Sequence, residues 1–131
     1  MSLLQWKPEY SVGIESMDDE HREMIGLINA TYEKLENESD AGQIEDCLGE
    51  ILSTISMHFA LEERMMRRSR YADYQAHKDD HEKLLDQIRD LMDVFFDDAV
   101  TGSKLLEERL SSWFAAHFSS FDARLHGQLK D

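Results

Sequence analysis

Four successive segments of the sequence carry apolar side chains every three or four residues, the spacing that places side chains on one face of an α-helix. Short polar stretches near residues 37–40, 67–71 and 97–102 interrupt this pattern. The apolar stripes consist of Ile25, Ile28, Tyr32 and Leu35; Ile44, Leu48, Ile51, Ile55 and Met65; Tyr74, Leu84, Ile88, Leu91 and Phe95; and Leu106, Leu110 and Trp113. Four amphipathic helices with short connections predict an all-α fold, an antiparallel up-down-up-down four-helix bundle.

Polar residues near the start of each predicted helix are candidates for N-caps, because their side-chain oxygens can accept a bond from a free backbone N–H. The candidates are Ser16 or Asp18 for the first helix, Asp40 with Gln43 as a capping box for the second, Asp73 for the third, and Thr101 or Ser103 for the fourth. These positions set the expected helix starts.

The segment before the first predicted helix has a different period. Its alternating apolar residues are Trp6, Pro8, Tyr10, Val12 and Ile14. A period of two indicates an extended segment with one buried face. We therefore expect an extended N-terminal arm at residues 1–15, a bundle at residues 16–131, and a single domain overall.

Composition narrows the class of protein. A chain of 131 residues with 41% hydrophobic residues and one proline is typical of a folded, helix-rich domain. The net charge of −14 argues against nucleic acid and anionic membrane surfaces as partners, because both attract cationic patches. No apolar run approaches the ~20 residues of a membrane span, and we expect no signal peptide. The single Cys47 excludes an internal disulfide and fits a reducing compartment, so we expect a cytoplasmic protein.

Several polar residues interrupt the apolar stripes, and all of them lie near one end of a predicted helix. They are His21 in the first helix, His58 and Glu62 in the second, His77 and His81 in the third, and His117 in the fourth. In an up-down bundle these four helix ends lie together. Five histidines and a glutamate are therefore expected to face one layer of the core.

A single histidine on an apolar face is usually a hydrogen-bonded core residue. Burying five imidazoles and a carboxylate costs several kcal/mol unless each is paired, and the stripes contain no lysine or arginine for pairing. Imidazole and carboxylate groups are common metal ligands, so the pattern favours a metal site.

Asp122 follows His117 by five residues, about 140° around an ideal helix, and it can join the site only if the helix breaks or bulges near residues 119–120. Without such a bulge Asp122 is an ordinary surface acid, and we expect the sixth histidine, His126, to be exposed.

Together these residues resemble the hemerythrin family, in its single-domain bacterial form. The matching motifs are His21, His58-x-x-x-Glu62, His77-x-x-x-His81 and His117-x-x-x-x-Asp122, with Trp6, Tyr10, Gly13 and Asp18 upstream and the His58-Phe59 and Trp113-x-x-x-His117 segments. The resemblance covers nearly the whole chain. It implies a non-haem di-iron cofactor, two iron ions joined by an oxo or hydroxo bridge, and reversible binding of O2.

By this resemblance His77, His81 and His117 would hold one iron, His21 and His58 the other, and Glu62 and Asp122 would bridge them. NO and azide-like anions are further expected ligands, and no enzymatic activity is expected. Trp113 and Phe114 are candidates for the wall of the O2 pocket, or else ordinary core residues; the family commonly has leucine at the position of Phe114.

Three other functions are compatible with the residues. The chain could be an O2, redox or NO sensor that acts through an unidentified protein partner, although we expect no fused output domain. It could be a di-iron peroxidase or oxygenase, although those bundles typically use carboxylate-rich sites. It could also be a purely structural bundle without metal.

Overall fold

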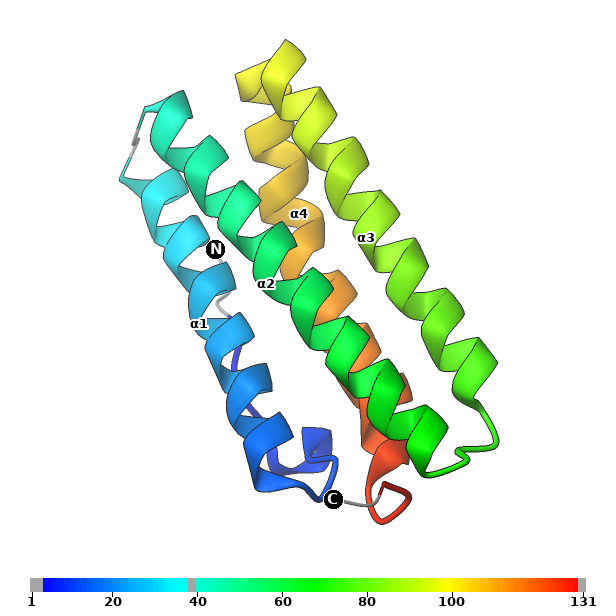
Figure 1. Ribbon diagram of the computed structural model, residues 1–131. Helices are drawn as coiled ribbons and strands as arrows, with labels where there is room; N and C mark the ends of the chain where they lie inside the picture. Colours follow the sequence, from blue (N-terminus) through cyan, green and yellow to red (C-terminus); the bar gives the residue numbers. More distant parts are fainter. Residues whose placement is uncertain (1–3, 38–39, 130–131) are drawn as a thin grey trace.

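The computed structural model describes residues 4–37 and 40–129. Within these residues four α-helices lie side by side in an antiparallel up-down-up-down bundle, as the sequence predicts (Figure 1). The helices are α1 (Glu15–Glu36), α2 (Ala41–Arg68), α3 (Tyr74–Asp97) and α4 (Ala99–His117). The start of α1, the end of α2, the start of α3 and the end of α4 meet at the lower end of the bundle in Figure 1.

Most of the predicted apolar stripes line the core. The exceptions are half-buried: Leu35, Met65, Tyr74 and Trp113. Two neighbours are fully buried instead, Met66 and Phe114, at 0% exposure each. Steps of three and of four both fit a period of 3.6. The spacing alone therefore cannot choose between adjacent residues at the edge of a stripe.

The segment before α1 is only partly extended, which corrects the predicted alternation. A short 3-10 helix spans Pro8–Tyr10, and Pro8 is exposed. Proline suits the first position of such a turn because its φ is fixed and the missing N–H is not needed there. Leu4 is attached to α1 by two hydrogen bonds: its N–H donates to Asn29 Oδ1 (2.9 Å), and Asn29 Nδ2 donates to its carbonyl (2.8 Å).

The start of α1 also differs from the prediction. Its N-cap is Ile14, which makes no side-chain cap bond, so neither Ser16 nor Asp18 caps the helix. Asp18 instead accepts hydrogen bonds from Ser11 Oγ (2.6 Å) and from the N–H of Val12 (2.9 Å). This carboxylate attaches the end of the arm to the first turn of α1.

The predicted N-caps of the other three helices agree only partly with the structure. Asp40 caps α2 as predicted and accepts a bond from the N–H of Gln43 at 2.8 Å. Asp73 occupies the N-cap position of α3 but makes no side-chain cap bond. The prediction of Thr101 or Ser103 for α4 is wrong: Asp98 caps this helix and accepts bonds from the N–H groups of residues 100 and 101. The helix starts earlier than expected because only Asp98 separates α3 from α4.

Gly102 allows this tight connection. In the first turn of α4 it lies directly against the end of α3, and a Cβ atom built on Gly102 would be 2.5 Å from Phe95 Cα. The obstacle is backbone, so no side-chain rotation can relieve it.

We therefore expect Gly102→Ala to destabilise the protein by about 1–3 kcal/mol, the usual cost of overpacking. Gly49→Ala is the matched control, because a Cβ atom there meets nothing within 4 Å. That change should stabilise α2 by about 0.5–1 kcal/mol, since glycine is a poor helix former. Urea unfolding of the three proteins measures both effects, and equal midpoints for the two variants would contradict the close approach.

Candidate metal centre

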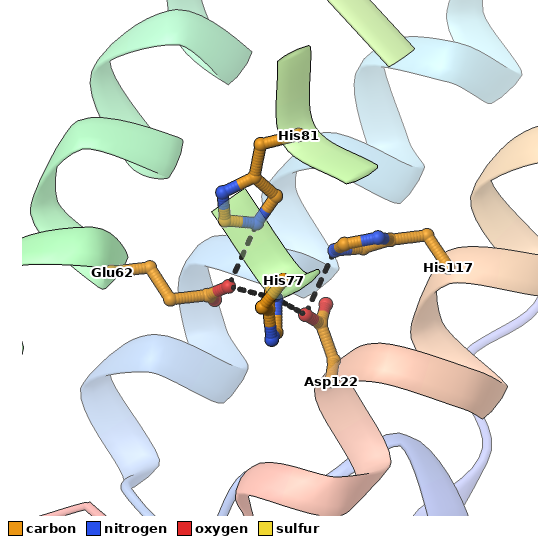
Figure 2. Close-up of side chains that lie close together, drawn as sticks. All are labelled: Glu62, His77, His81, His117 and Asp122. Carbon is orange, nitrogen blue, oxygen red and sulfur yellow. Dashed lines mark hydrogen bonds and ion pairs between the residues drawn. The ribbon is translucent and has the colours of Figure 1, made fainter. Parts of the chain in front are cut away.

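Seven side chains converge at the end of the bundle where the four helix termini meet. They are His21 from α1, His58 and Glu62 from α2, His77 and His81 from α3, His117 from α4, and Asp122 just beyond α4. Five of them are drawn in Figure 2, where their polar ends point toward one another. None of the seven is more than 3% exposed. Every histidine that the sequence placed on a stripe reaches the cluster, and His126 is exposed outside it.

Asp122 reaches the cluster through an irregular turn. α4 ends at His117 and continues as a π-helix over Phe118–Asp122. A π-helix bonds each residue to the fifth one along the chain and is wider than an α-helix. Residues five apart therefore approach the same face, and Asp122 Oδ1 lies 2.9 Å from His117 Nε2. This is the bulge near residues 119–120 that the sequence required.

One oxygen of each carboxylate faces a group of three imidazoles, and each of these oxygens contacts two of them. Glu62 Oε1 lies 2.9 Å from Nε2 of His77 and 3.0 Å from Nε2 of His81. Asp122 Oδ1 lies 3.0 Å from Nε2 of His77 and 2.9 Å from Nε2 of His117. We call His77, His81 and His117 the three-histidine group.

The second oxygen of Glu62 faces both remaining imidazoles, and the second oxygen of Asp122 faces one of them. Glu62 Oε2 lies 3.1 Å from Nε2 of His21 and 3.2 Å from Nε2 of His58. Asp122 Oδ2 lies 3.4 Å from Nε2 of His21. We call His21 and His58 the two-histidine group. Each carboxylate therefore lies between the two groups and turns one oxygen toward each.

The buried carboxylates and imidazoles of the cluster shift one another's pKa values. Burial tends to raise the pKa of the Glu62 carboxyl, but the four histidines around it hold the pKa well below its usual value. Burial and Glu62 likewise oppose ionisation of Asp122, yet His117 and His21 lower its pKa to about 2. Burial lowers the pKa of His117, whereas Asp122 and Asp80 outweigh this and raise it to about 10. Both carboxylates are therefore anionic at neutral pH.

Several ring nitrogens of the cluster remain without a hydrogen bond. His58 Nε2 and His117 Nε2 are buried and unbonded, although carboxylate oxygens lie about 3 Å away. The ligand atoms form two sets, each within 4.8 Å: one from Glu62, Asp122 and the three-histidine group, and one from Glu62 and the two-histidine group. Imidazole nitrogens and carboxylate oxygens are suitable ligands for iron and similar cations. The donor set thus fits two cations that share a carboxylate.

A second layer of carboxylates lies outside the imidazoles. His81 Nδ1 is 2.9 Å from Glu63 Oε2, and His117 Nδ1 is 2.6 Å from Asp80 Oδ2. Sequence reasoning did not assign these roles to Glu63 or Asp80. Glu63 adjoins Glu62 and Asp80 adjoins His81, but acids next to core positions are common on helices, so adjacency is a weak signal.

Aromatic rings enclose the cluster. Phe59 stacks on His81 with 3.8 Å between ring centroids, and Phe121 stacks on His117 at 5.7 Å. Phe118 packs against His21 at 5.3 Å. Of the two predicted pocket residues, Phe114 is buried and contacts Phe118 at 5.9 Å between centroids. Trp113 is half-buried and, together with His117, lines a depression of about 140 Å³.

The family model described as Hemerythrin HHE cation binding domain matches residues 12–129. The chain belongs to the hemerythrin family. The buried cluster therefore belongs to a domain whose family is described as binding cations.

Individual relatives agree over nearly full length. The bacteriohemerythrin of Methylococcus capsulatus is 28% identical over 130 residues, which cover 97% of this chain and 96% of that protein. The bacteriohemerythrin of Aquifex aeolicus is 27% identical, covering 92% of each chain. A solved crystal structure of a leucine-to-phenylalanine mutant is 24% identical, with a TM-score of 0.81 over 98% of both chains, and it supports the fold. Among the described residues, no helix is both long and apolar enough to cross a membrane.

The coupled charges predict how the stability of the metal-free protein depends on pH. The pKa of His117 is raised from 6.5 to about 10, so its contribution is complete below pH 6.5 and is lost as pH rises toward 10. The pKa values of His21 and His77 are also raised, which acts in the same direction. Urea unfolding of chelator-treated protein should therefore show a free energy of unfolding that falls between pH 6.5 and 9.5.

The control for this measurement is His126→Gln, which alters an exposed histidine outside the cluster. It should show the same decline with pH, whereas His117→Gln should show a smaller one. A free energy of unfolding that stays constant or rises over this range would contradict the assigned charges.

Proposed function

We propose that this chain holds two iron ions as a non-haem di-iron centre, with an oxo or hydroxo bridge, and binds O2 reversibly. The observation that carries the proposal is the division of the carboxylate oxygens. Glu62 and Asp122 each direct one oxygen to the three-histidine group and one to the two-histidine group. Two carboxylates in this arrangement suit a pair of cations and would bridge them.

The donor sets of the two groups are unequal. The three-histidine group and the two carboxylates offer one cation three nitrogens and two oxygens. The two-histidine group and Glu62 offer the other cation two nitrogens and one oxygen, and Asp122 Oδ2, 3.4 Å from His21 Nε2, would add a second oxygen. The second cation has one protein donor fewer, so the free position for a small ligand would lie beside His21 and His58.

When bound, the iron pair supplies the electrons that reversible O2 binding requires. The chain positions the iron pair through the imidazole Nε2 atoms and keeps its surroundings dry. Phe118, packed against His21, and Phe114 behind it would form the apolar wall next to the free position. Trp113 lies beside the three-histidine group, so its proposed part in the pocket is more distant.

Reversible binding is favoured over substrate oxidation by the chemistry of the donors. Di-iron bundles of the ferritin-like class bind their metals through four glutamates and two histidines, and two of these glutamates belong to Glu-x-x-His motifs. Here five imidazoles, which are neutral when they bind a metal, accompany only two inner carboxylates. A donor set with fewer anionic groups gives less stabilisation to highly charged oxidised iron, which supports a binding protein.

The decisive measurement is an optical titration of the reduced, iron-quantified protein with O2. We expect two irons per chain and a new visible absorption band that appears under O2 and disappears under vacuum. The same titration with NO and azide would define the other small ligands. Rapid, irreversible oxidation without a band that vacuum removes would contradict an O2 carrier.

Replacing His77 and His81 by alanine should reduce the iron content of the reconstituted protein by at least half, because both imidazoles belong to one donor set. His126→Ala is the matched control and should retain two irons, since His126 lies outside the cluster. Metal analysis after gel filtration compares the variants. Undiminished iron in the double variant would leave only a structural role for the cluster.

A further inference from the structure

The two groups of histidines differ in what supports their outer ring nitrogens. In the three-histidine group, Nδ1 of His81 and of His117 lie 2.9 Å and 2.6 Å from the carboxylates of Glu63 and Asp80, whereas Nδ1 of His77 is buried without a hydrogen-bond partner. In the two-histidine group, Nδ1 of His21 is buried without a hydrogen-bond partner. Nδ1 of His58 is also unbonded, and its nearest acid, Glu20, is 3.7 Å away.

An outer carboxylate affects how an imidazole binds a cation. When Nδ1–H donates to a carboxylate, the proton is held on that nitrogen and Nε2 keeps its lone pair for the metal. The same bond fixes the ring orientation and raises the basicity of Nε2. Loss of such a partner typically weakens metal binding by about 10–100-fold.

Packing adds to the difference. The rings of His81 and Phe59 are almost parallel, with an interplanar angle of 6°, and those of His117 and Phe121 meet at 16°. In the other group, His21 meets Phe118 at 37° and His58 meets Phe59 at 53°. Stacked rings resist rotation, so two imidazoles of the three-histidine group are oriented before any cation arrives.

We propose that the two halves of the site load in order: the three-histidine group takes the first divalent cation, and Glu63 and Asp80 are its positioning residues. The two-histidine group takes the second cation, more weakly. This inference rests on the proposed two-cation site. On this proposal, the three-histidine group binds its cation more tightly and anchors the pair. The two-histidine group binds more weakly and lies on the side where a small ligand would enter.

Calorimetric titration of the chelator-treated full chain with Co²⁺ alone, under anaerobic conditions, tests the order. We expect two binding steps whose dissociation constants differ by at least about tenfold. Replacing both His21 and His58 by alanine should remove the second step and leave the first within about twofold. A single step for two equivalent ions in the unaltered chain, or loss of the first step in this double variant, would overturn the proposal.

The positioning residues are tested by Glu63→Gln and Asp80→Asn, which keep size and remove charge. Each should weaken the first step by about 10–100-fold while leaving the circular dichroism spectrum of the metal-free protein unchanged. Glu20→Gln is the matched control, because Glu20 approaches the two-histidine group without a hydrogen bond. It should leave the first step within about twofold.

These outcomes separate the inference from the function on which it rests. If Glu20→Gln weakened the first step as much as Asp80→Asn, the effect would be one of general charge, and the positioning role would be wrong. If the unaltered chain bound two ions in one step, the proposed two-cation site would be supported and the proposed order of binding would be wrong. If it bound no Co²⁺ and no iron, the proposed function itself would fail.

Discussion

The structure depends on two buried carboxylates that face five imidazoles. Glu62 and Asp122 are at most 1% exposed, and each oxygen lies near at least one ring nitrogen. A buried anion costs several kcal/mol unless it is paired. Among the described residues, the ion pairs of both carboxylates are with histidines. The pairing requires the ends of four helices to meet in one layer. The same requirement therefore determines both the register of the four helices and the geometry of the site.

The arm before α1 contributes to this closed end. Tyr10 packs against Phe118 with ring centroids 5.5 Å apart, and Phe118 packs against His21. Asp18 holds the arm in place through Ser11 and the backbone of Val12. The 3-10 turn at Pro8–Tyr10 is thus more than a connection, because it directs a ring onto the apolar wall beside the two-histidine group.

The proposed function places two requirements on the site that usually conflict. A cation would have to be held firmly, and a small ligand would have to reach an incomplete coordination sphere. Outer carboxylates and stacked phenylalanines support two of the imidazoles in the three-histidine group. Neither imidazole of the two-histidine group has a hydrogen bond at its outer nitrogen, and this group offers one histidine fewer. Glu62 and Asp122 contact histidines of both groups. A cation held firmly by the three-histidine group would therefore also keep these carboxylates in position beside the two-histidine group.

The sequence by itself determined the four helices and the inward-facing histidines, because a period of 3.6 is a local property that each segment carries alone. It also showed that Asp122 needed a bulge, which the π-helix at Phe118–Asp122 provides. Only the tertiary structure decided that Phe114 rather than Trp113 is buried, that Asp98 caps α4, and that Asp80 meets His117. These outcomes depend on how neighbouring helices rotate and approach one another, and no spacing within one helix records that.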